Sequence, residues 1–235
     1  MLLLLLACSA TKDETIDSDA PESAEDTAPA VDRAPLAFAL PLADDTVFGT
    51  VLGVDHDPEV REGIEQILCT NYAGEPWCYD EHDGTDYLLD GTWEAMDSGS
   101  VAILAAADGV VVETHDGEYD RCHGDLTTFE VSCDGYPMVA NKVVLEHEGG
   151  YRTSYLHMMK GSVAVAVGDA VACGDSLGLV GSSGRSSQPH LHFELQDADG
   201  LVIDPYAGEF SQPETWWVSQ GEPDELPAIE CWDER

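Results

Sequence analysis

Apolar runs with alternating or β-branched residues dominate the chain after residue 35. They are punctuated by glycine, aspartate and serine, and they occupy residues 101–115, 141–150, 151–158, 162–181 and 189–196. Alternation with a period of two and closely spaced turn residues are typical of β-strands with short connections. Helical periodicity is scarce, and its best candidate is 59–68, with apolar residues at positions 60, 64, 67 and 68. The pattern predicts a mainly β fold, an antiparallel sheet or sandwich with few short helices.

The first 35 residues have a different pattern. Five consecutive leucines, then Ala7 and Cys8, make residues 1–8 resemble the lipoprotein-type signal of bacteria, with Cys8 as the lipid-modified residue. The run is too short to span a bilayer and lacks a basic flank, so we expect the true start to lie upstream; a simple leader that is removed is the alternative. Residues 9–35 are acidic and rich in Ser, Thr, Ala and Pro. They predict a disordered tether between a lipid surface and the domain.

Six cysteines follow Cys8 in the sequence. In an oxidising compartment six cysteines can form three disulfides, in fifteen possible combinations. Short sequence separations favour Cys69–Cys78 and Cys122–Cys133, which leaves Cys173–Cys231. A thiolate metal site is the alternative, but the chain has no C-x-x-C pair to support it. The six cysteines therefore predict export. Together with the signal at Cys8, they predict a protein of the cell envelope, anchored by lipid in the outer membrane or facing the periplasm.

The charge balance limits the possible partners. The chain has 9 Lys+Arg against 47 Asp+Glu, a formal net charge of −38. Nucleic-acid binding requires clustered basic side chains, so we exclude nucleic acid as a partner. At physiological salt the reach of such a charge is about 8 Å, so it says little about short-range recognition. An anionic substrate would have to be captured locally.

Two pairs of side chains carry candidate metal chemistry. His190 and His192 share one face of a predicted strand, while Leu191 and Phe193 point to the other. His82 and Asp86 are four residues apart, an even spacing that places both on one face of an extended segment. Imidazole and carboxylate suit Zn²⁺, and a catalytic site needs three protein ligands and an open position. His82, Asp86 and one histidine of the pair would supply this set.

Five motifs in order resemble the lysostaphin-type, LytM-like peptidoglycan endopeptidases, peptidase family M23. They are HDGTD at 82–86, AADGVVV at 106–112, YLHM at 155–158, GDAVACGDSLGLVGSSGRS at 168–186 and PHLHFEL at 189–195. The resemblance implies an antiparallel sheet that forms an open groove with one Zn²⁺ per chain at its base. It also implies that His82, Asp86 and His192 are the zinc ligands and that His157 and His190 are non-ligand catalytic histidines.

The resemblance divides the chain after the tether into three parts. Residues 36–77 are an N-terminal extension, 78–206 are the peptidase core and 207–235 are a C-terminal extension. Within the core, 88–104 and 113–140 are longer than the family's usual connections, and we expect the second to be a loop pinned by its two cysteines.

Three functions remain open from the sequence. The first is a zinc endopeptidase that cuts peptide stems or cross-bridges of peptidoglycan, and the five filled motif positions favour it. The second is a non-catalytic LytM-like module that binds or regulates a cell-wall hydrolase. The third is a biotinyl- or lipoyl-type carrier modified on Lys160, which leaves the histidines without a role. We expect Trp216 and Trp217 to be buried rather than to stack on sugars, and His56, His115, His123 and His147 to lie on the surface.

Overall fold

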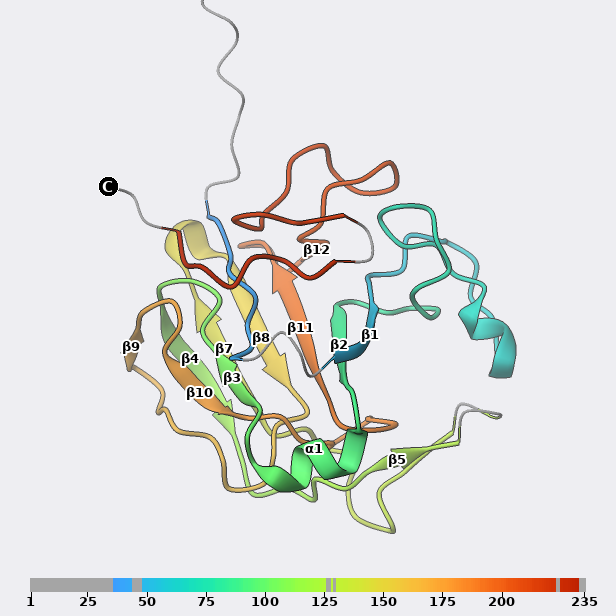
Figure 1. The fold of residues 1–235 in the computed structure, drawn as a ribbon, viewed down its shortest axis with the longest axis horizontal. Helices are drawn as coiled ribbons and strands as arrows, with labels where there is room; N and C mark the ends of the chain where they lie inside the picture. The colour runs from blue at the N-terminus through green and yellow to red at the C-terminus, as the bar shows by residue number, and fades with distance from the viewer. Residues whose placement is uncertain (1–35, 44–47, 126–127, 129, 223–224, 233–235) are drawn as a thin grey trace, which may run out of the picture. The chain divides into compact units, whose positions relative to one another are not determined.

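An eight-stranded sheet forms the centre of the fold (Figure 1). The computed structural model describes residues 36–43, 48–125, 128, 130–222 and 225–232. Predictions about Cys8 and the acidic tether therefore lie outside the described residues. Along the sheet the strand order is β1–β2–β11–β8–β7–β4–β9, and β12 also pairs with β11. The strands are β1 (Phe48–Leu52), β2 (Thr85–Leu89), β4 (Gly109–His115), β7 (Lys142–Glu146), β8 (Arg152–Leu156), β9 (Ala170–Val171), β11 (His190–Gln196) and β12 (Val202–Ile203).

Every strand pair of the sheet is antiparallel. Two short antiparallel pairs lie outside it: β3 (Ala102–Leu104) with β10 (Ser176–Leu179), and β5 (His123–Gly124) with β6 (Val131–Ser132). The helices are α1 (Thr92–Ser98) and the 3₁₀ turns η2 (Gly63–Ile67) and η3 (Glu148–Gly150). The prediction of a mainly antiparallel β fold with few short helices is confirmed. None of the helices in the described ranges is both long and apolar enough to cross a bilayer.

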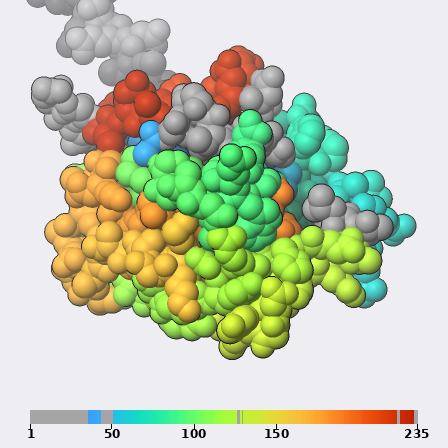
Figure 2. Space-filling model, turned by 60° about the horizontal axis from the view of Figure 1, so that its bottom comes forward, coloured from blue at the N-terminus to red at the C-terminus, as the bar shows by residue number. Residues whose placement is uncertain are grey.

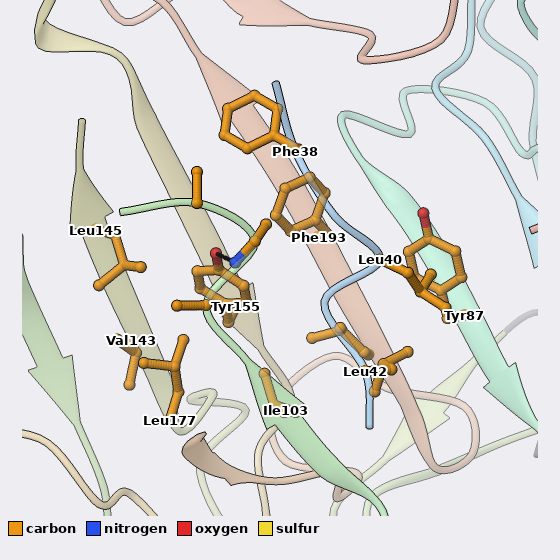
Figure 3. Close-up of a cluster of buried hydrophobic side chains, with 14 of the residues drawn as sticks. Phe38, Leu40, Leu42, Tyr87, Ile103, Val143, Leu145, Tyr155, Leu177 and Phe193 are labelled. Carbon is orange, nitrogen blue, oxygen red and sulfur yellow. Dashed lines mark hydrogen bonds between the residues drawn. The ribbon is translucent and has the colours of Figure 1, made fainter. Parts of the chain in front are cut away.

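The two faces of β11 have different chemistry. Leu191 and Phe193 are fully buried, as the alternation predicts. Leu191 lies opposite Tyr87 of β2, and Phe193 lies opposite Tyr155 of β8. These side chains belong to one apolar cluster on a single face of the sheet, which Figure 3 shows. The histidines of β11 alternate with them and therefore project from the opposite face.

Segments from both ends of the described chain complete this apolar cluster. Figure 3 shows the segment with Phe38, Leu40 and Leu42 passing close to Phe193. The main-chain N–H of Phe38 donates to the carbonyl of Trp216 at 2.7 Å, and the Phe38 ring stacks on the Trp216 ring. Trp216 and Trp217 are buried, as predicted. Side chains from outside the motif-bearing region therefore help to hold β11 in place.

All three predicted disulfides are present: Cys69–Cys78, Cys122–Cys133 and Cys173–Cys231. The first closes a loop within the segment between β1 and β2, and the second closes the loop that contains β5 and β6. The third joins the turn between β9 and β10 to the C-terminal segment. It closes the longest of the three loops, with a sequence separation of 58.

We expect the Cys173–Cys231 disulfide to stabilise the fold more than Cys69–Cys78 does. A disulfide reduces the entropy of the unfolded chain in proportion to the logarithm of loop length, so the separation of 58 corresponds to about 4 kcal/mol and that of 9 to about 2.5 kcal/mol. Replacing each pair by serines and measuring urea unfolding tests this order. A larger loss of unfolding free energy for the Cys69–Cys78 variant would contradict it.

The helix predicted over 59–68 is wrong. Only the 3₁₀ turn η2 forms there, and Val60, Ile64 and Leu68 are each more than half exposed. A ten-residue helix is marginal unless one face packs against a core, and this segment has no such contact. Arg61 holds it instead, through ion pairs with Asp57, Glu59 and Asp80.

The two longer connections contact each other. Residues 88–104 contain α1, and 113–140 contain the β5–β6 hairpin with its disulfide. Arg121 forms an ion pair with Asp97 of α1, and its guanidinium lies 5.8 Å from the centre of the Trp93 ring. Figure 2 shows α1 and the 113–140 segment adjacent on one face of the molecule. The expected pinned loop is therefore a hairpin that packs on α1.

Candidate active site

Three buried side chains bring their ligand atoms together. Asp86 of β2 lies directly opposite His192 of β11, and His82 precedes β2 by a tight turn. Asp86 Oδ1 lies 2.8 Å from His192 Nδ1 and 3.2 Å from His82 Nε2, and the two nitrogens are 3.3 Å apart. All three residues are at most 6 % exposed. The predicted ligand set of His82, Asp86 and His192 thus forms one cluster.

The geometry of this cluster fits zinc. Ligands at about 2.0–2.1 Å from a tetrahedral Zn²⁺ lie about 3.3–3.4 Å apart. Two of the three separations here, 3.2 and 3.3 Å, are close to this value, and the third, 2.8 Å between Asp86 Oδ1 and His192 Nδ1, is shorter. Two imidazole nitrogens and one carboxylate oxygen are also the donor types that Zn²⁺ takes in catalytic sites, where a fourth position stays open. The residues present therefore fit a catalytic zinc ion.

Gly84 makes room for His192. A Cβ atom at this position would lie 2.6 Å from Cε1 and Nε2 of His192 and 2.8 Å from the carbonyl oxygen of Phe193. No side chain fits at that distance without moving the imidazole, so the turn between His82 and Asp86 requires glycine.

Outer contacts fix the orientation of the ligands. His82 Nδ1 donates to the carbonyl of Gly53 at 2.6 Å, which leaves Nε2 free to bind a metal. Asp86 Oδ2 accepts a hydrogen bond from the Tyr79 hydroxyl at 3.1 Å, so Oδ1 faces the two imidazoles. The Tyr79 ring stacks on the His82 ring with centroids 4.1 Å apart. Such contacts set the tautomer and the orientation of metal ligands.

His157 and His190 lie beside the ligand cluster. His157 directly follows β8 and has a positive φ of 64°, and its Nδ1 donates to the carbonyl of Ser183 at 2.7 Å. His190 Nδ1 donates to the carbonyl of Gln188 at 2.7 Å, and its Nε2 lies 3.4 Å from Asp86 Oδ1. The rings of His157 and His190 have centroids 4.6 Å apart. The structure thus brings all five predicted residues together, and strain at His157 is typical of a functional position.

The pKa values of these two histidines move in opposite directions. Burial lowers the pKa of His157, and the neighbouring His190 and His192 push it well below its ordinary value. Burial also disfavours the charged form of His190, but the Asp86 carboxylate outweighs this and raises the pKa of His190. His157 is therefore neutral at neutral pH, whereas His190 retains a proton more readily. Such a divergence is typical of an acid and a base in one site.

Asp86 is the charge that organises the site. Burial alone would raise its pKa, but His82 and His190 and its hydrogen bonds with histidines hold the pKa well below the ordinary value. The carboxylate is therefore ionised at neutral pH and can act as a metal ligand.

Two of the supporting groups carry no recognisable signal in the sequence. Gly53 acts through its main-chain carbonyl, and every residue type has that group. Tyr79 precedes His82 by three residues and belongs to none of the five motifs. The only signal near it in the sequence is Cys78, which forms a disulfide with Cys69.

The prediction that His147 lies on the surface is wrong. The side chain is buried, its Nδ1 lies 2.7 Å from the carbonyl oxygen of Asp108, and its Nε2 lies 2.7 Å from Thr153 Oγ1. These two contacts satisfy both ring nitrogens inside the fold, and no local pattern reveals them. His123 is exposed as predicted, while His56 and His115 are partly exposed.

Two curated relatives match part of the chain. A relative from Vibrio cholerae named peptidoglycan DD-endopeptidase ShyA is 34 % identical over 114 residues, which is 48 % of this chain and 20 % of that protein. DD-carboxypeptidase/endopeptidase Mpg of Neisseria meningitidis is 32 % identical over 133 residues, which is 57 % of this chain and 24 % of that protein. The chain thus spans a quarter or less of the length of these relatives.

Among solved structures, the catalytic domain of lysostaphin from Staphylococcus simulans is 26 % identical to this chain. The aligned part covers 53 % of this chain and 76 % of the lysostaphin domain, and the TM-score is 0.36. The family model described as Peptidase family M23 matches residues 81–205, which are 125 of 235 residues. This match contains His82, Asp86, His157, His190 and His192. The chain belongs to peptidase family M23.

Proposed function

We propose that the chain is a zinc-dependent endopeptidase that hydrolyses peptide bonds of peptidoglycan in the bacterial cell envelope. The observation that carries the proposal is the convergence of His82 Nε2, Asp86 Oδ1 and His192 Nδ1 beside two further buried histidines. The names of the relatives from Vibrio cholerae and Neisseria meningitidis support peptidoglycan as the substrate and a D,D-peptide bond as the target. The substrate would lie in an open groove along the face of the sheet that carries the histidines.

Each side chain of the site has a role in this chemistry. Zn²⁺ bound by His82, Asp86 and His192 would supply Lewis acidity, which polarises the scissile carbonyl and lowers the pKa of water to about 7. His157, with its lowered pKa, accepts the proton of the attacking water as a general base. His190, with its raised pKa, donates a hydrogen bond to the developing oxyanion and a proton to the leaving amine.

The other two functions make less use of the site. A non-catalytic module has no need for a complete ligand set with two extra histidines. A carrier modified on Lys160 leaves the whole cluster without a role. The complete cluster therefore favours the enzyme, and a protein that holds zinc but binds peptidoglycan without cutting it would favour the module.

Export and lipid attachment complete the proposal. Three disulfides favour an oxidising compartment such as the periplasm. Attachment through lipid on Cys8 would place the domain at the outer membrane or facing the periplasm. Mass spectrometry of the mature protein tests this attachment, and an unmodified Cys8 would exclude it.

Metal analysis tests the cofactor. We expect about one Zn²⁺ per chain, loss of peptidase activity after chelation, and recovery on adding back an equivalent of Zn²⁺. Activity that persists after complete removal of metal would exclude the zinc mechanism.

We expect Tyr79→Phe to weaken zinc binding about 10- to 100-fold, the usual cost of losing an outer contact to a ligand. The variant keeps the stack on His82 but removes the hydrogen bond to Asp86 Oδ2, so the carboxylate can rotate away from its position. Competition with a chromophoric chelator measures the affinity. Tyr119→Phe is the matched control, because it removes only an exposed hydroxyl that is bonded to Asp134. Equal affinities for the two variants would contradict this role of Tyr79.

A further inference from the structure

Among the described residues, the Arg185 guanidinium has no ion-pair partner, although the protein is very acidic. Of the six Lys and Arg residues in the described ranges, four form ion pairs: Arg61, Arg121, Lys142 and Arg152. The main-chain N–H of Lys160 donates to the Asp120 carboxylate, and its ammonium forms no ion pair within the described residues. Within the described part of the chain, the guanidinium of Arg185 has no carboxylate partner and no hydrogen bond. With 47 acidic residues in the chain, pairing would be the ordinary outcome.

The loop that carries Arg185 is tightly held. Ser182, Ser183 and Ser186 are fully buried, whereas Arg185 between them is exposed. Ser182 Oγ donates to the carbonyl of Cys122, and Ser183 Oγ donates to the carbonyl of Met158. The loop therefore presents a single charged side chain to solvent from a fixed backbone.

The backbone beside Arg185 is also fixed by close packing. Gly184 has a positive φ of 74°, and a Cβ atom there would lie 2.8 Å from the main-chain nitrogen of Ala140. No larger residue fits without moving the loop. Arg185 is therefore positioned by its neighbours and not by contacts of its own side chain.

The same loop holds both candidate catalytic histidines. The carbonyl of Ser183 accepts the hydrogen bond of His157 Nδ1, and Ser186 Oγ lies 3.2 Å from His190 Nδ1. The loop that carries Arg185 therefore borders both candidate catalytic histidines, beside which a scissile bond would lie.

We propose that Arg185 is a substrate-binding residue that pairs with a free carboxylate of the peptide, close to the bond that is cleaved. The proposal rests on the peptidase function proposed above and defines its substrate class as acidic peptides. A planar guanidinium suits this role because it binds a carboxylate through two parallel hydrogen bonds. It also solves a problem that the net charge of −38 creates, since an anionic peptide needs a local positive charge to bind.

The test uses matched synthetic cross-linked stem peptides in which each free carboxylate in turn is replaced by a primary amide. We expect one of these amide substitutions to lower the kcat/KM of the wild-type protein about 10- to 100-fold relative to the unmodified peptide. This range corresponds to the loss of a hydrogen bond to a charged group. In Arg185→Gln this ratio should fall to near one while zinc content stays at the wild-type level. Arg185→Lys should keep part of the preference for the acid over the amide, because lysine retains the positive charge but cannot form the two parallel hydrogen bonds of a guanidinium.

Arg152→Gln is the matched control, since Arg152 is paired with Glu146 on the surface and should keep the wild-type ratio. If wild type cleaves acid and amides equally, or if Arg185→Gln keeps the wild-type ratio, the role of Arg185 is wrong and the peptidase function stands. If the zinc-loaded wild type cleaves none of the peptides, the peptidase function fails and the role of Arg185 fails with it.

Discussion

His192→Ala should lose both zinc and peptidase activity. His192 Nδ1 is one of three ligand atoms, and it lies 2.8 Å from Asp86 Oδ1 and 3.3 Å from His82 Nε2. With alanine only two protein ligands remain, fewer than the three that catalytic zinc sites use. Elemental analysis should find far less than one Zn²⁺ per chain after dialysis. Cleavage of cross-linked peptides should fall to the level of a chelated sample.

The control for this variant is His123→Ala, which removes an exposed imidazole that belongs to none of the five motifs. It should keep zinc and activity. Circular dichroism of both variants shows whether the sheet remains folded. If folded His192→Ala kept full zinc and full activity, the ligand assignment would be wrong.

His190→Ala should separate catalysis from metal binding. His190 is not in the ligand cluster, although its Nε2 lies 3.4 Å from Asp86 Oδ1. The variant should therefore keep most of its zinc while the rate falls about 100-fold or more, the range for a lost general acid or base. Zinc content and kcat, measured on the same preparation, give the two readouts.

The pH profile of the rate gives a second readout for His190. An acid works only when protonated, so the wild-type rate should fall as pH rises through the raised pKa of His190. A base works only when neutral, so the rate should also fall in acid, below the lowered pKa of His157. His190→Ala should lose the alkaline decline and keep the acid one. Loss of zinc in step with activity would make His190 a ligand instead.

The sequence predicts which side chains of the candidate site lie together, because much of its information is local. Even spacing places His190 and His192 on one face of β11. The extended segment expected for His82 and Asp86 is wrong, because the chain bends at Gly84 before β2 begins, and this bend brings His82 to Asp86. The antiparallel register of β2 and β11 then places Asp86 opposite His192. The family resemblance implies that these two residues bind the same metal ion, but the sequence alone does not give this register. The disulfides follow from loop length in the same way, because nearby cysteines pair first.

The remaining features depend on contacts between distant residues. The Gly53 carbonyl reaches His82 across 29 positions, and the Ser183 carbonyl reaches His157 across 26. Neither has a side-chain signature. The apolar residues of 59–68 predict a helix, but these side chains do not pack against the core of the described fold. Val60 and Ile64 remain exposed. His147 lies in a polar stretch, yet Asp108 and Thr153 bind it inside the fold.

Digestion of purified peptidoglycan sacculi tests the central claim most directly. Zinc-loaded protein should release peptides whose new ends, identified by mass spectrometry, come from hydrolysis of one kind of peptide bond, with D,D-cross-links as the expected target. Chelated protein and His192→Ala should release none. If the zinc-loaded protein binds sacculi and leaves every peptide bond intact, the chain is a binding module and not a peptidase.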